Sequence, residues 1–341
     1  GSPTGRGLVS DFPYTAHAEV NRYPLPLYFQ DPEADFYTWD YLYAGFPGED
    51  ARTFTTSLPG VAGTGQPTLT VRLQGGSDTA APDEHHVRLT WNGRDLGETV
   101  WDGLVPHVVS IPLGAGDVVE GNNTLVVTAI LEPGLDYDVV YLDSFDVSYA
   151  RLYKAVGDEL SFTVPAGSDA VVSGFSAPGA ALLDVTSAAS PTLVTGTASF
   201  MAPDGTYALR FANRGATKRS YLAAVPENAK RPVSLTPGRT PVLSAATNRA
   251  DYLLIAPSGL VAAAESLAAY RRTRGLDTMV VDLEDVHDEF GFGLATPVAV
   301  QDFLAHATGT WARPPQYVTL VGRGTFDYKD AQGVGDNLMP T

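Results

Sequence analysis

The chain has 341 residues, of which 44% are hydrophobic and 18% are charged, so it is long enough for two or three domains with sizeable cores. Its formal net charge of −17 argues against a general nucleic-acid surface, because such a surface would repel phosphates. The sequence contains no cysteine, which excludes disulfides, thiolate metal sites and a cysteine nucleophile within these residues.

The sequence gives few targeting signals. No apolar run is long enough to span a membrane, and no signal peptide is visible. The opening residues, GSPTG, look like a tag scar on an internal fragment, so the missing signal carries little weight. The acidic composition is compatible with secretion.

Residues 1–150 predict an antiparallel β-sandwich. Short segments alternate apolar and polar residues, and Gly, Pro, Asn and Asp separate them. The pair Asn92-Gly93 predicts a tight hairpin, because these residues accept the positive φ angles of such a turn. The expected strands cover residues 67–76, 85–93, 107–113, 123–131 and 139–152.

Residues 151–245 predict a second, smaller β-rich domain and a linker. The segment 226–250 is rich in proline and lacks periodicity, as expected for a connection to the next unit. The expected strands cover residues 158–164, 170–175, 180–194, 198–202, 206–213 and 219–225.

Residues 246–341 predict a parallel α/β unit. Strands and helices alternate in the order β-α-β-α-β, with Ser258 and Thr296 as expected helix N-caps. Three strands and two helices would leave much of the sheet exposed, so we expect the first half of a doubly wound domain, with the natural polypeptide continuing past Thr341. The expected elements cover residues 251–257, 258–275, 277–283, 296–311 and 316–322.

No catalytic constellation is evident from the residues. Gly322-Arg323-Gly324 follows the third strand, but neither G-x-G-x-x-G nor G-x-x-x-x-G-K-[ST] is present, so we expect these glycines only to turn the chain sharply. No G-x-S-x-G elbow occurs. His85 and His86 are expected to form a solvated pair, and His287 to lie in a solvated acidic loop.

Carboxylates near residue 140 are weak calcium candidates. Asp136, Asp138 and Asp143, with Asp146 beyond them, cluster around the expected last strand of the sandwich, and carboxylates suit Ca²⁺. Their spacing is not that of an EF-hand. No other cofactor is expected.

The third region resembles the gingipain-type (C25 family) cysteine peptidases. The matching segments, in the family's order, are DYLLIAP, a helix ending in RRTRG, VDLEDVHDEFGFG, PVAVQDFL, YVTLVGRGTFDYKD and NLMPT. The β-rich segments upstream are similar to those that precede the peptidase domain in larger members. The first of them also looks like galactose-binding-type jelly rolls.

This resemblance implies a caspase-like α/β fold and a His-Cys dyad that hydrolyses peptide bonds in a protein or peptide substrate. In the family both dyad residues lie beyond the segment that matches NLMPT, so no catalytic residue is expected in this chain. Gly322, Arg323, Gly324 and Asp327 would belong to the rim of the active site. Arg323 stands where the family usually has Asp, which puts the role of that position in doubt.

Two functions follow from these observations. The first is the N-terminal portion of a secreted or cell-surface gingipain-like cysteine endopeptidase, inactive in this truncated form. The alternative is a non-enzymatic surface module, in which the sandwich binds carbohydrate or protein on a dead peptidase scaffold. Its candidate sugar-stacking residues are Tyr37, Trp39, Tyr41 and Tyr43, whose alternating spacing favours packing instead. Substrate specificity, oligomeric state and processing sites stay open.

Overall fold

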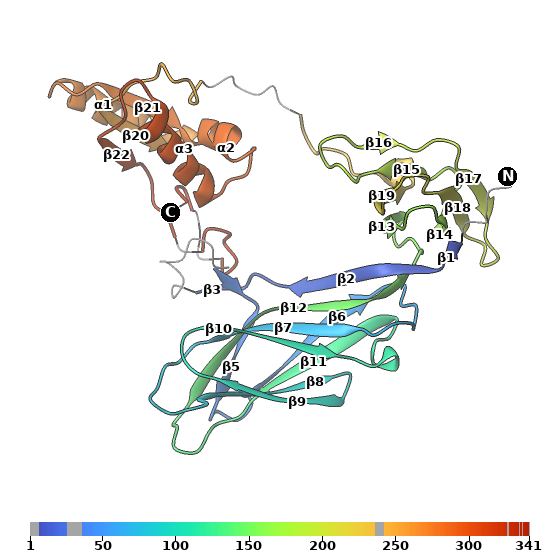
Figure 1. Cartoon of the computed structure of the whole chain (residues 1–341). Helices are drawn as coiled ribbons and strands as arrows, with labels where there is room; N and C mark the ends of the chain where they lie inside the picture. Colours follow the sequence, from blue (N-terminus) through green and yellow to red (C-terminus); the bar gives the residue numbers. More distant parts are fainter. Residues whose placement is uncertain are drawn as a thin grey trace. The chain divides into compact units, whose positions relative to one another are not determined.

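The computed structural model describes residues 7–25, 36–235, 242–325, 327–333, 335 and 337–340. The chain divides into two compact units, one of Gly1–Val20 with Tyr37–Pro232 and the other of Asn21–Phe36 with Val233–Thr341. β structure dominates and an α/β region follows it, which confirms the predicted fold class (Figure 1). The domain limits at residues 150 and 245 stay predictions.

The first unit begins with a sandwich of two antiparallel sheets. One has the order β10-β7-β12-β2, with β5 also paired to β12, and the other has the order β6-β11-β8-β9. Its strands are β2 (Asp11–Glu19), β5 (Asp40–Ala44), β6 (Ala51–Leu58), β7 (Thr68–Gly75), β8 (His85–Trp91), β9 (Arg94–Trp101), β10 (Pro106–Pro112), β11 (Gly121–Ala129) and β12 (Asp138–Leu152). The sequence had predicted β7, β8, β10, β11 and β12, and had missed the rest.

Alternating side chains of both sheets fill the sandwich core. Leu125 and Val127 of β11 are fully buried against Leu142 and Phe145 of β12 within one cluster. This is the inward alternation expected of facing sheets. Asn92 has φ 48° and Gly93 φ 80°, so the predicted hairpin between β8 and β9 is confirmed.

A second pair of sheets lies in the same unit. β1 pairs with β14 in parallel, so the first described residues belong to this second pair of sheets and not to the sandwich. The segment 180–194, expected as one strand, is a hairpin of β15 and β16. The strands, in the orders β1-β14-β18-β17 and β13-β19-β15-β16, are β1 (Leu8–Val9), β13 (Glu159–Val164), β14 (Asp169–Phe175), β15 (Ala181–Asp184), β16 (Thr192–Leu193), β17 (Ala198–Met201), β18 (Tyr207–Ala212) and β19 (Arg219–Ala224).

The α/β region is built on a parallel sheet with the order β21-β20-β22. Leu253 and Ile255 of β20 pack with residues of α2 and α3, whereas Leu254 packs with Ala264 and Ala268 of α1. The central strand β20 is therefore covered on both faces, as its continuous apolar sequence predicted. The elements are β20 (Tyr252–Ala256), α1 (Val261–Arg272), β21 (Thr278–Asp282), α2 (Leu283–Phe290), α3 (Pro297–Thr310) and β22 (Tyr317–Leu320).

Three local predictions in this region differ in outcome. The Thr296 side chain accepts a hydrogen bond from the backbone N–H of Ala299, so its N-cap role is confirmed. Ser258 is not the cap of α1; it opens a 3₁₀ turn, and Leu260 precedes the helix without a side-chain cap. The acidic segment expected as a loop is the helix α2, capped by Asp282.

Several short elements complete the described structure. No helix within the described ranges is long and apolar enough to cross a membrane. The short elements are β3 (Tyr23–Pro24), β4 (Tyr37–Thr38) and the 3₁₀ helices η2 (Ala115–Asp117), η3 (Pro226–Asn228) and η4 (Ser258–Leu260).

Candidate functional site at the carboxyl ends of the parallel strands

A hollow of about 280 Å³ lies at the carboxyl edge of the parallel sheet. The chain enters it directly after β20, at Pro257 and Ser258, and directly after β21, at Leu283 and Glu284. The chain runs from β20 to β21 on one side and returns to β22 on the other, so the order of strands reverses at β20. Ligands of open α/β sheets bind at this edge. The other lining residues are His287, Ala295, Tyr328, Asn337, Leu338 and Pro340.

Ser258 and Asp282 join the ends of the two adjacent strands. The Ser258 hydroxyl lies 3.0 and 2.8 Å from the two carboxylate oxygens of Asp282. Oδ1 of the same carboxylate accepts a hydrogen bond from the backbone N–H of Glu284, which caps α2. The Asp282 carboxylate thus both orients the Ser258 hydroxyl and caps the N-terminus of α2.

His287 contributes an imidazole to the hollow. Burial lowers its pKa, although the charges of Glu284 and Asp288 act in the opposite direction. Its Nε2 is buried and makes no hydrogen bond to the described residues. No hydrogen bond joins Ser258 to His287 within these ranges, so the hollow holds no serine-histidine pair ready for nucleophilic attack.

The rim residues predicted after β22 lie where the chain turns away from the sheet. Gly322, Arg323 and Gly324 are exposed, and Gly322 has φ +126°. A Cβ at Gly322 would lie 3.3 Å from that of Leu338, so glycine suits the position both sterically and in backbone conformation. The carbonyl of Arg323 accepts a hydrogen bond from the N–H of Met339 at 3.1 Å, which holds the last described residues beside Arg323.

Asp327 is buried and organises the loop. Its side chain is 2% exposed, and its two oxygens accept hydrogen bonds from the backbone N–H groups of Ala331 at 2.9 Å and Gln332 at 2.7 Å. Its own N–H donates to the Thr325 hydroxyl at 3.3 Å. The carboxylate is therefore engaged in holding the loop that borders the hollow, with no free face toward a substrate.

The calcium candidates do not converge. Asp138 is fully buried, and its Oδ1 lies 2.7 Å from both Ser77 Oγ and His85 Nδ1. Asp136 is exposed, and Asp143 is partly buried on the opposite face of β12 from Asp138. In the described ranges no group of three His, Cys, Asp or Glu side chains could hold a metal. Asp136 precedes β12, and alternation along β12 turns Asp138 and Asp143 to different faces, so the structure does not bring these carboxylates together.

The candidate sugar-stacking aromatics also lie in different environments. Tyr37 is fully buried, and Trp39 stacks on Phe145 of the sandwich core at 5.8 Å. Tyr43 instead stacks on Phe46, with ring centroids 4.2 Å apart. Packing thus accounts for Tyr37 and Trp39, whereas Tyr43 belongs to a group of rings that includes the exposed Phe46 and Tyr137.

Residues 245–341, which contain the hollow and its rim, match the family model described as Peptidase family C25. This segment belongs to peptidase family C25. The C25 segment thus comprises the parallel sheet, its three helices and the last described residues. No curated protein matches the sequence.

A solved structure extends the likeness of fold beyond the C25 segment. Dimeric latent PorU from Porphyromonas gingivalis matches 97% of this chain with a TM-score of 0.67 and 17% identity. The match covers 32% of PorU, so this chain spans about a third of that relative's length. The CBM36-1 domain of a xylanase from the hindgut metagenome of Trinervitermes trinervoides matches 39% of this chain and 96% of its own, with a TM-score of 0.26 and 16% identity.

Proposed function

We propose that this chain is the N-terminal part of a secreted, gingipain-like cysteine endopeptidase that cleaves proteins or peptides. The observation that carries the proposal is the C25 match of residues 245–341, on a parallel sheet whose carboxyl edge opens into a hollow. The sequence holds no cysteine, so the nucleophilic thiolate of the proposed His-Cys dyad would come from residues outside this chain.

The exposed edge of the sheet supports this proposal. Tyr317, Val318 and Leu320 of β22 are 53%, 40% and 37% exposed, whereas every residue of β20 is buried. Strands of parallel sheets are normally covered on both faces, because crossover helices pack there. A further strand and helix supplied by the remainder of the peptidase would cover these side chains.

Under this proposal the present chain has no peptidase activity of its own. Its contribution to catalysis would be structural: Ser258 and Asp282 fix the ends of β20 and β21, and Asp327 holds the loop after β22. Arg323 is exposed at the rim, where it would present a positive charge in place of the aspartate usual in the family. The extracellular location is part of the same proposal.

A peptidase assay tests the proposal. The protein purified from its source is incubated with a mixed peptide substrate, with and without a thiol-alkylating reagent, beside the 341-residue chain. We expect cleavage by the source protein that alkylation abolishes, and none by the 341-residue chain. Cleavage that survives alkylation, or that the 341-residue chain performs alone, would contradict the cysteine mechanism.

A binding function of the sandwich is the second candidate, and one surface feature favours it. Phe46 and Tyr137 are each 47% exposed and both contact Tyr43, at ring-centroid distances of 4.2 and 5.5 Å. Exposed aromatic rings of this kind present apolar faces on which a sugar ring can stack. We would screen the chain on a glycan array beside Phe46→Ala; the function fails if no glycan distinguishes the two proteins.

A further inference from the structure

Three histidines of the sandwich share an unusual set of partners. In each of them both ring nitrogens face an oxygen that serves as an acceptor. His17 lies 2.7 Å from Asp146 Oδ1 and 2.8 Å from Glu19 Oε2. The further contacts are His85 with Asp138 Oδ1 at 2.7 Å and the Gly103 carbonyl at 3.1 Å, and His86 with Glu132 Oε1 at 2.5 Å and Glu98 Oε2 at 2.9 Å.

A neutral imidazole cannot satisfy such a pair of partners. It carries one N–H donor and one nitrogen that only accepts, whereas the imidazolium form donates from both nitrogens. A carbonyl oxygen has no proton to give, and Asp138 Oδ1 already accepts the Ser77 hydroxyl at 2.7 Å, as a carboxylate would. We infer that His17, His85 and His86 are held as imidazolium ions and act as proton-dependent clasps that stabilise the sandwich and release it as the pH rises above neutrality.

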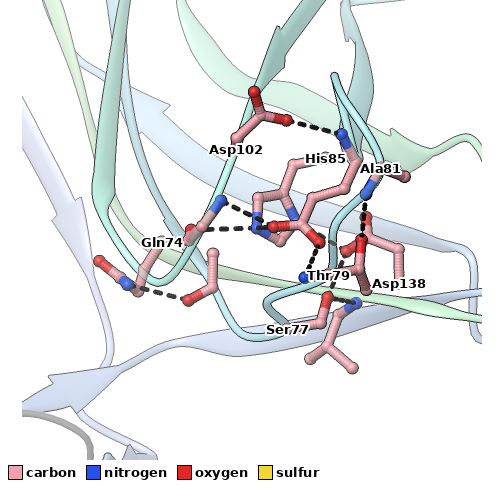
Figure 2. Close-up of polar contacts among 11 residues, drawn as sticks. Gln74, Ser77, Thr79, Ala81, His85, Asp102 and Asp138 are labelled. Carbon is pink, nitrogen blue, oxygen red and sulfur yellow. Dashed lines mark hydrogen bonds and ion pairs between the residues drawn. The ribbon is translucent and has the colours of Figure 1, made fainter.

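His85 is the clasp inside the sandwich (Figure 2). Its side chain is fully buried, and it joins β8 of one sheet to Asp138 on β12 of the other. Its second nitrogen holds Gly103, in the turn between β9 and β10. The expectation of a solvated histidine pair is thus wrong for His85, because alternation along β8 turns it inward.

The charges around His85 balance its own. Glu84 Oε1 lies 3.7 Å from His85 Nε2, and this buried carboxylate accepts hydrogen bonds from the N–H groups of Gly103 and Thr79. Asp102, which directly follows β9, accepts a hydrogen bond from the backbone N–H of Glu84. A buried cation between two buried carboxylates is stable only while all three keep their partners, so losing the proton of His85 leaves Asp138 and Glu84 without their cation.

His86 and His17 form the outer clasps. His86 joins β8 to Glu98 on β9 and to Glu132 beyond β11, and Arg88 also pairs with Glu98. His17 on β2 bridges to Asp146 on β12, which Arg72 of β7 also contacts at 2.8 Å. The His17 side chain is 52% exposed, so solvent screening makes this clasp the weakest.

The pKa directions agree with this geometry. Burial alone would lower the pKa of His85, but the hydrogen bond and charge of Asp138 and the charge of Glu84 outweigh it, and the pKa is raised. The pKa of His86 is raised in the same way by Glu132 and Glu98. His107 stacks on Trp101 beside His85, and its Nε2 lies 2.7 Å from the Thr99 hydroxyl. Its pKa is lowered by burial and by the charge of His85.

The sign of the pH effect follows from these directions. A histidine whose folded pKa is raised gives its full stabilisation below the unfolded value of about 6.5 and loses it as the pH rises through the folded pKa. Within that window each such histidine lowers the folding equilibrium constant about tenfold per pH unit. We therefore expect the sandwich to weaken between neutral and mildly alkaline pH.

Nitrogen NMR of the 341-residue chain, labelled with ¹⁵N at histidine, reads all six rings at once. We expect His17, His85 and His86 to keep both ring nitrogens protonated at pH 7.5, where His107 and His287 are neutral. Substitution of each histidine by glutamine assigns the signals. A His85 ring with one unprotonated nitrogen at pH 7.0 in the wild-type protein, once the variants have assigned its signals, would overturn the inference.

Urea unfolding between pH 5.5 and 8.5 tests the effect on stability. Hydrogen exchange of peptides from β8 and β12 gives the unfolding midpoint. We expect the wild-type midpoint to fall as the pH rises, and His85→Gln to lower the midpoint most at pH 5.5 and least at pH 8.5. His306→Gln in the C25 segment is the matched control and should leave the pH slope of β8 and β12 unchanged. If His85→Gln also leaves the pH slope of the unfolding midpoint unchanged, the inference for His85 is overturned.

Discussion

At the residue scale, Gly75 at the end of β7 occupies a position with no room for a side chain. A Cβ there would lie 2.2 Å from the Gly103 carbonyl oxygen and 2.4 Å from His85 Nε2, both of which are fixed by the buried clasp. We expect Gly75→Ala to lower the free energy of unfolding by about 1–3 kcal/mol, since overpacking forces neighbours apart. Urea unfolding at pH 6 measures this loss.

Gly116 provides the matched control for Gly75. A Cβ at Gly116 meets nothing within 4 Å, so Gly116→Ala should change the free energy of unfolding by no more than about 0.5 kcal/mol. Equal losses in the two variants would show that His85 and Gly103 do not pack against Gly75 as described.

Thr296 provides a second test at this scale, because its side chain caps α3 in the C25 segment. We expect Thr296→Ala to reduce the free energy of unfolding by about 1 kcal/mol, because the Ala299 N–H loses its acceptor. Thr296→Ser retains the hydroxyl and should lose much less. Hydrogen exchange in the first turn of α3 measures both, and equal exchange in the two variants would rule out the cap.

Sequence reasoning succeeded where one residue and its near neighbours decide the outcome. The turn at Asn92-Gly93 and the cap at Thr296 depend on local backbone chemistry, and both are confirmed. His85 could not be assigned in this way, because its partner Asp138 is 53 residues away and only the facing sheets bring the two together. The separation of Asp138 from Asp143 depends instead on strand alternation, which turns them to opposite faces of β12.

At the element scale, α3 is anchored by one aromatic side chain. Phe303 is fully buried and contacts Phe290 of α2 and Trp311, at ring-centroid distances of 5.3 and 5.8 Å. We expect Phe303→Ala to cost the C25 segment about 3–5 kcal/mol, through lost burial and the cavity left behind. The midpoint of urea unfolding, followed by hydrogen exchange of peptides from α3, measures the effect.

Val298 lies on the same helix and is 55% exposed, so it serves as the control for Phe303. Val298→Ala should shift the midpoint little, because an exposed side chain leaves no cavity. A shift as large as that of Phe303→Ala would mean that another face of α3 is buried.

Elements with a strong period were predictable, and short ones were not. The central strand β20 and the helices α1 and α3 were predicted because long apolar patterns specify them. The eight-residue α2 was read as a loop, since its acidic residues dominate the pattern and its cap, Asp282, ends the preceding strand. β1 has two residues, and only its pairing with β14 defines it as a strand.

At the scale of the whole molecule, stability should be greatest on the acid side of neutrality. The pKa of Asp146, Asp184 and Glu289 is lowered by hydrogen bonds and cations in the folded state, so their stabilisation is present above about pH 4 and is lost as the pH falls through the folded values. The raised pKa values of His17, His85 and His86 have the opposite effect: their stabilisation is lost as the pH rises above about 6.5. We expect the melting temperature to peak near pH 5–6.

Added salt distinguishes the effect of the three histidines from the general repulsion between negative charges. The net charge of −17 also disfavours the folded state as histidines lose protons, but added salt screens that repulsion. Salt screens the interaction of the buried His85 with its carboxylates much less. A fall in melting temperature between pH 6 and 8.5 should therefore persist in about 0.5 M NaCl, and a fall that salt removes completely would contradict the clasp.

The fold class and the C25 likeness were accessible from the sequence because they depend on the order of many elements. The hollow was not, because its wall combines the ends of β20 and β21, the first turn of α2 and the segment after β22. The predicted rim residues rest on the resemblance alone, and none of the four lines the hollow. Their structural roles differ: Gly322 turns the chain, whereas Asp327 is buried and holds the loop.

The central proposal is that this chain is part of a C25 cysteine peptidase whose thiol lies outside it. The most direct measurement is the intact mass of the protein isolated from its source, with and without a thiol-alkylating probe. We predict a mass well above the 36.1 kDa of this chain, together with uptake of the probe at a cysteine that follows residue 341. A native mass close to 36.1 kDa with no uptake would contradict the proposal, because such a protein has no thiol nucleophile.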